Sequence, residues 1–111
     1  MNVQVEVQKF GIYYNDLKNS DKVWGIARIN NTLVTFWGRR NGKLKFKTVL
    51  KGQAEKAMLA WSEKTNPFRN GDTYSSVDRL DQRRQYAPTL EQDLVHYFYT
   101  DMSKGKLNTR H

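Results

Sequence analysis

The dipeptide Asn41-Gly42 lies between two segments in which apolar and polar residues alternate, and no other feature constrains the fold as much. Residues 33–39 precede the dipeptide and residues 43–49 follow it, so the pattern predicts a β-hairpin. Side chains alternate between the two faces of a strand. The length of the connecting loop therefore decides which residues of the hairpin face the core.

Two loop lengths are compatible with this sequence. A two-residue loop pairs Trp37 with Phe46 and places Phe36 on the same face as a row of lysines. A three-residue loop, Arg40-Asn41-Gly42 with Gly42 in the left-handed conformation, pairs Trp37 with Lys45 instead. We favour the three-residue loop because charged side chains are rarely buried without partners. The inner face then carries Val34, Phe36, Leu44 and Phe46, and the outer face carries Trp37, Arg39, Lys43, Lys45 and Lys47.

Similar alternation predicts two further strands upstream of the hairpin. One covers residues 3–14 with a bulge at Gly11, the other covers residues 23–29, and a loop at residues 15–21 joins them. Trp24, on the second strand, is expected in the core rather than at a ligand surface.

Two helices are expected after the hairpin. The first covers residues 52–64, where Ala54, Ala57, Met58 and Trp61 form an apolar stripe that places Trp61 in the core. Residues 69–87 have few apolar side chains and predict a long, partly ordered loop. A second helix is expected to begin at Thr89, with Gln92 reaching back to the cap and a stripe of Leu90, Leu94, Tyr97 and Phe98. The segment at residues 103–111 is expected to be a frayed tail.

These elements predict an α+β fold in which an antiparallel meander packs against a helix, with a second helix near the C-terminus. A chain of 111 residues suits one domain, spanning residues 1–111. The sequence contains no cysteine, no continuous apolar run of signal-peptide length and no stretch of about 18 apolar residues. We therefore expect a soluble, cytoplasmic protein without membrane contact.

Little in the sequence suggests catalysis. The only histidines are His96 and His111, so a histidine-based metal cluster is not expected. Four carboxylates, at Asp78, Asp81, Glu91 and Asp93, could in principle bind Mg²⁺ as in a nuclease. Arginines 79, 83 and 84 lie among them, so surface ion pairs are the favoured interpretation. We expect no enzyme, no metal and no cofactor.

Residues 7–68 resemble the WGR domain, a module found beside the catalytic region of poly(ADP-ribose) polymerases and in bacterial proteins. The resemblance rests on the triplet Trp37-Gly38-Arg39, an upstream strand with Tyr13 and Tyr14, the predicted helix with Trp61, and the run Lys64-Thr65-Asn66-Pro67-Phe68. Residues 69–111 would be a loop and helical extension of this domain. The family binds DNA, so the resemblance implies that Trp37 packs near the sugar at a strand end and that Arg39 contacts DNA or a neighbouring domain.

Charge and motif together predict a nucleic-acid-binding protein. Nineteen Lys and Arg against eleven Asp and Glu leave a net charge of +8, which favours anionic partners. DNA is the expected partner, with ends or breaks as a candidate target, and RNA stays open. An adaptor for an acidic protein is the alternative. The predicted contact residues are Trp37, Arg39, Arg40, Lys43, Lys45 and Lys47.

Overall fold

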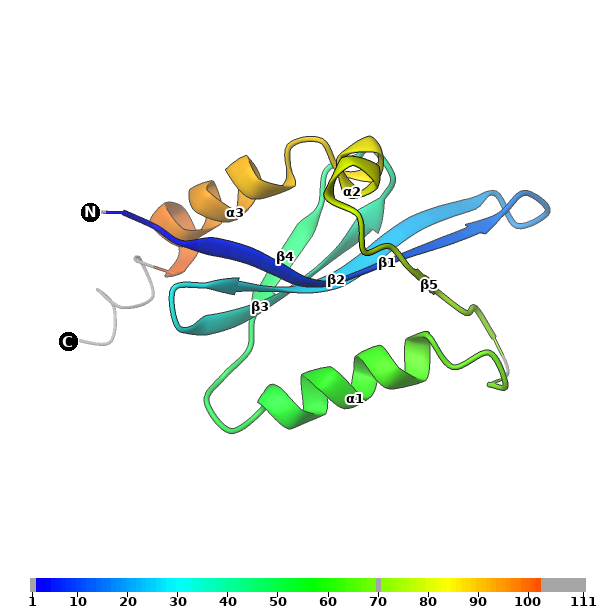
Figure 1. Ribbon diagram of the computed structural model, residues 1–111, viewed down its shortest axis with the longest axis horizontal. Coiled ribbons are helices and arrows are strands. Elements are labelled where there is room, and N and C mark those ends of the chain that lie inside the picture. Colours follow the sequence, from blue (N-terminus) through cyan, green and yellow to red (C-terminus); the bar gives the residue numbers. More distant parts are fainter. Residues whose placement is uncertain (1, 70, 103–111) are drawn as a thin grey trace.

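A five-stranded antiparallel sheet forms the centre of the molecule (Figure 1). The computed structural model describes residues 2–69 and 71–102. The strands, in sheet order, are β4 (Lys45–Thr48), β3 (Thr32–Arg39), β2 (Ser20–Ile29), β1 (Val5–Asn15) and β5 (Ser75–Ser76). The first four strands follow one another along the chain, so they form the predicted meander.

Helices lie on both faces of this sheet. One face carries α1 (Ala54–Lys64), and the other carries α2 (Leu80–Tyr86) and α3 (Leu90–Tyr97), which continues into a π-helical turn, η1 (Phe98–Met102) (Figure 1). The predicted α+β fold with a C-terminal helix is confirmed. Among the described residues, no helix is both long enough and apolar enough to cross a membrane.

The β3–β4 hairpin has the register that the three-residue loop predicts. Trp37 lies opposite Lys45, and Phe36 lies opposite Phe46. The left-handed residue of the turn is Asn41, with φ of 58°, and not Gly42 as predicted. Asparagine tolerates this conformation, while the Gly42 N–H closes the turn on the Arg39 carbonyl oxygen at 2.9 Å. Strand β4 is shorter than the predicted 43–49.

The β1–β2 hairpin is longer than the sequence pattern predicted. The predicted loop at residues 15–21 is wrong, because the strands pair as far as Asn15 and Ser20 and leave a four-residue turn. The register shifts between Val7 and Lys9, so the bulge lies there and not at Gly11. This shift explains how odd-numbered Val5 and Val7 share a face with even-numbered Phe10.

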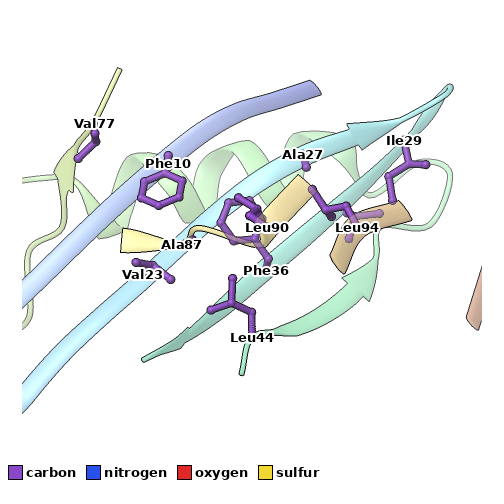
Figure 2. Packing of buried hydrophobic residues seen from close by; sticks show 11 residues of the cluster. Phe10, Val23, Ala27, Ile29, Phe36, Leu44, Val77, Ala87, Leu90 and Leu94 are labelled. Carbon is purple, nitrogen blue, oxygen red and sulfur yellow. The ribbon is translucent and has the colours of Figure 1, made fainter. Parts of the chain in front are cut away.

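The main hydrophobic core lies between the sheet and the C-terminal helices. Figure 2 shows Phe10, Ala27 and Phe36 of the sheet beside Leu90 and Leu94 of α3. The Phe10 and Phe36 rings lie 5.8 Å apart. Gly25 makes room for this packing, since a Cβ there would lie 2.3 Å from the Phe36 ring and from the Lys9 carbonyl oxygen.

Helix α1 covers the opposite face less completely. Ala57 is its buried residue, Ala54 is exposed, and Trp61 is half-buried, so the placement of Trp61 in the core is wrong. Trp61 instead stacks on Trp24, with ring centroids 6.2 Å apart and ring planes 19° apart. Trp24 is itself half-buried, which corrects its expected place in the core. The α1 layer is therefore separate from the main core.

The segment expected to be a loop at residues 69–87 contains β5 and α2 among its described residues. It contributes Val77 and Ala87 to the core and is held by Arg83, which donates to the carbonyl oxygens of Val77 at 2.7 Å and Val7 at 3.1 Å. Thr89 occupies the N-cap position of α3, as predicted. Its hydroxyl donates to the Asp93 carboxylate at 2.8 Å and forms no capping hydrogen bond to the helix backbone. The predicted tail at 103–111, with His111, lies outside the described residues.

Candidate nucleic-acid interface

A hollow of about 660 Å³ opens on the α1 side of the sheet. Alternate residues of β2 and β3 face it, because side chains two apart share a face. The end of α1 and the segment before β5 supply the remaining wall. Its lining, here called the aromatic cleft, consists of Lys22, Val23, Trp24, Thr35, Trp37, Gly38, Arg39, Lys64 and Tyr74.

The register of β2 and β3 sets the chemistry of the cleft. Trp24 lies directly opposite Trp37, and Lys22 lies directly opposite Arg39. Two cations facing each other across an antiparallel pair destabilise a sheet. The cleft therefore concentrates positive charge beside two indole rings, an arrangement that packing alone does not favour.

The position of Trp24 depends on a close approach between α1 and the sheet. Its stacking partner Trp61 lies over Gly11, where a Cβ would come 2.9 Å from the Trp61 ring. The Tyr74 N–H donates to the Lys64 carbonyl oxygen at 2.7 Å and so joins the segment before β5 to the end of α1. Glycine at position 11 thus allows the helix to bring Lys64 beside the aromatic rings.

Lys64 is a cation of the cleft that lies beside aromatic rings and has a lowered pKa. Its Nζ atom lies 5.2 Å from the centroid of the Trp24 ring and 5.6 Å from that of Tyr74. Partial burial lowers the pKa of the Lys64 ammonium, the nearby cations Arg69 and Lys22 lower it further, and Glu63 opposes this. Among the described residues, no carboxylate forms an ion pair with Lys64. Its ammonium lies against aromatic faces instead of a carboxylate, and its charge is available to an external anion.

Neighbouring residues orient the other two cations. Arg39 donates to the carbonyl oxygen of Asn19 at 3.1 Å and to its Oδ1 at 3.4 Å. Lys22 lies 3.5 Å from Asp72. A hydrogen bond from the Tyr13 hydroxyl lowers the pKa of Asp72, and its lysine neighbours act in the same direction. Asp72 therefore stays ionised beside the cleft and fixes one of its cations.

A second hollow, of about 320 Å³, lies between α1 and the β3–β4 edge. It shares Trp24 and Thr35 with the aromatic cleft, and it adds Lys47 and Lys56. None of the residues that line either hollow is acidic. We call the two hollows together the α1-side groove.

The structure separates the six predicted contact residues into three groups. Trp37 and Arg39 line the aromatic cleft, and Lys47 lines the second hollow. Lys43 and Lys45 lie on the other side of Trp37, in a hollow that also contains Asp93, His96 and Asp101. Arg40 turns toward α2, where it pairs with Asp21 at 2.9 Å and lies over the Tyr86 ring.

Sequence reasoning did not assign Lys22, Lys64 or Tyr74 to the interface. Lys22 could have been found if the strand predicted at residues 23–29 had been extended by one residue, because Lys22 lies two residues from Trp24 in β2 and thus shares its face. Lys64 belongs to the motif run at residues 64–68, although nothing in that run indicates its aromatic neighbours. Tyr74 is brought to the cleft by the fold of a segment that the sequence pattern did not resolve.

Within residues 2–69 and 71–102, no three His, Asp or Glu side chains are grouped so that they could hold a metal ion. Comparisons with models of protein families, with curated proteins and with solved structures found no match.

Proposed function

We propose that this protein binds DNA without catalysis, through the α1-side groove, in the manner of the WGR domain that its sequence resembles. One observation carries the proposal: cations and aromatic rings line the groove together, and no acidic side chain lines it. Phosphates attract the cations, and indole rings stack on sugars and bases. The sequence contains no cysteine, so the fold needs no disulfide and is compatible with a reducing compartment, and we propose a cytoplasmic location.

Trp37 is the residue that we expect to distinguish one nucleic-acid form from another. Its indole is partly exposed where the aromatic cleft meets the hollow around Lys45. The interior of a duplex offers only grooves and phosphates to such a ring, whereas an end or a break exposes a base and a sugar face. Stacking on one base contributes about 1–3 kcal/mol. Ends and breaks are therefore the proposed targets.

The cations of the groove supply affinity rather than selectivity. Lys22, Arg39 and Lys64 surround the aromatic cleft, and contacts from such groups to phosphates carry no sequence information. The net charge of +8 increases the rate of encounter with any polyanion. Binding that is tight, sensitive to salt and independent of sequence is the expected behaviour.

The test compares wild type with Trp37→Ala on a linear duplex and on a closed circle of the same sequence, by mobility shift. Wild type should prefer the linear DNA, and Trp37→Ala should lose about 1–3 kcal/mol on it while the circle is bound as before. Tyr99→Ala is the matched control, since Tyr99 is an exposed ring on η1, outside the groove.

Equal binding of wild type to both forms, with no loss in Trp37→Ala, would remove the proposed role of Trp37. Tight binding to an acidic protein with none to nucleic acid would favour the adaptor instead. Matched RNA in the same panel decides between the two nucleic acids.

A further inference from the structure

Two large apolar side chains are almost fully exposed at one end of the molecule. Leu17 is 99% exposed in the β1–β2 turn, and Phe68 is 93% exposed in the segment between α1 and β5. Figure 1 shows this turn and this segment at the same end. An ion pair between Lys18 of the turn and Asp72 of the segment, at 3.5 Å, joins them.

The turn that carries Leu17 is held in one conformation by its own hydrogen bonds. The Asn19 N–H donates to the Asp16 carbonyl oxygen at 3.1 Å, and Asn19 has a left-handed φ of 51°. The Lys18 N–H donates to Asn15 Oδ1 at 3.3 Å. Leu17 is therefore presented to solvent by an ordered turn, and its exposure contributes nothing to the core.

Phe68 is presented in a similar way. Its N–H donates to Asn66 Oδ1 at 2.9 Å, which fixes the chain just after α1 ends. Neither apolar side chain has a role in folding that would explain its residue type. Both project from short, hydrogen-bonded segments.

The two segments that carry these apolar side chains adjoin the aromatic cleft. Arg39 lines the cleft and also holds the turn through its two hydrogen bonds to Asn19. Lys22 lines the cleft and, like Lys18 of the turn, contacts Asp72. A nucleic acid that lies in the cleft would therefore pass beside the segments that carry Leu17 and Phe68, here called the tips.

We propose that Leu17 and Phe68 insert into an opened base step of the DNA that the groove holds, an inference that rests on the proposed function. An apolar side chain gains nothing against phosphates, but it is buried when it enters between bases. Unstacking costs least where the stack is already broken or mispaired. The partner is accordingly a duplex that contains a nick, a gap or a mismatch.

A short nicked duplex with 2-aminopurine beside the nick tests this insertion, with the intact duplex as the reference. Wild type should raise the 2-aminopurine fluorescence, because insertion unstacks the base. Leu17→Ser and Phe68→Ser should reduce that rise and lower the preference for nicked over intact DNA by about tenfold. Leu59→Ser, an exposed leucine on α1 outside the groove lining, should behave as wild type.

Three results would overturn the inference while leaving DNA binding intact. The first is full fluorescence change and full nick preference in both tip variants. The second is a tip-dependent association with anionic vesicles, and the third is tip-dependent self-association in sedimentation velocity, each with unchanged DNA binding. Failure of wild type to bind any DNA would instead contradict the proposed function itself.

Discussion

At the scale of single residues, Lys64 carries a charge that the proposed DNA binding uses and that the folded protein destabilises. Burial and the neighbouring cations lower its pKa from the ordinary value of 10.5. The folded protein thus holds this proton less tightly than the unfolded chain does. Between the lowered pKa and 10.5 the unfolded state binds more protons, so the contribution of Lys64 to stability rises with pH across that window. At neutral pH its positive charge opposes folding.

Replacement of Lys64 by Met should therefore separate stability from binding. Lys64→Met keeps an apolar stem against the aromatic rings and removes the crowded charge, so we expect an unfolding free energy that is unchanged or higher at pH 7. DNA binding should weaken, and the dependence of log K on log salt should become shallower by about 0.9, as for one lost phosphate contact. Urea unfolding and salt titration measure the two effects.

Lys51→Met is the control for this pair of measurements, because Lys51 is exposed and does not line the groove. A Lys64→Met protein that is clearly less stable than wild type would show that the ammonium contributes more through its aromatic contacts than its crowding costs. Unchanged DNA binding would remove Lys64 from the interface.

At the scale of elements, the two faces of the sheet are built differently. Leu90 and Leu94 bury α3 against the main core, whereas α1 has Ala57 as its buried residue and relies on the stack of Trp61 on Trp24. Elements with few buried apolar contacts open at lower free energy than the rest of a fold. Helix α1, which forms one wall of the proposed interface, is therefore the element expected to open first.

Trp61→Ala and Leu94→Ala should consequently have different effects: the first should destabilise α1 alone, and the second should destabilise the whole fold. Leu94 is fully buried, so its truncation should lower the global unfolding free energy by about 2–5 kcal/mol. Trp61→Ala should release α1 while the sheet stays folded. Hydrogen exchange would then show lost protection at residues 54–64 and retained protection in β2 and β3. Loss of protection throughout the sheet in Trp61→Ala would show that α1 and the sheet unfold as one unit.

The contrast between the two faces of the sheet also explains which features of the fold could be predicted from the sequence. The register of the β3–β4 hairpin followed from alternation, because Phe36 and Lys45 cannot exchange faces without burying a cation. Helix α2 was missed because its segment has few apolar residues and is held partly by Arg83, whose bonds to backbone carbonyls leave no periodic signal. Trp61 was misplaced because an apolar stripe shows that a helix packs, but not which face of the sheet it meets.

The candidate site was predictable to a similar extent. Trp37, Arg39 and Lys47 lie on the outer face that the register assigned to them, and they line the groove. Arg40 could not be placed, because its partner Asp21 lies in a segment that was predicted to be a loop and that is part of β2 in the structure. The aromatic neighbours of Lys64 come from two distant segments, so no local pattern indicates them.

At the scale of the whole molecule, the cations on the two sides of the sheet have different surroundings. On the α2 side, Arg79 pairs with Asp81 at 3.0 Å and Arg84 lies 4.0 Å from Glu91. On the α1 side, Lys47 and Lys56 line a hollow that no acidic residue lines. These two cations of the groove therefore lack the acidic neighbours that Arg79 and Arg84 have on the α2 side.

This asymmetry leads to a prediction about the salt dependence of binding. If about four cations of the groove reach phosphates, log K should fall with log salt at a slope of roughly −3 to −4. The double variant Lys47→Gln/Lys56→Gln should make that slope shallower by about 2, because each lost phosphate contact removes about 0.9. Arg79→Gln/Arg84→Gln removes the same net charge from the opposite side and should leave the slope unchanged. Fluorescence anisotropy on one duplex over a salt series measures all three proteins. Equal slopes in the two double variants would mean that net charge alone governs binding, and the groove would then lose its place as the interface.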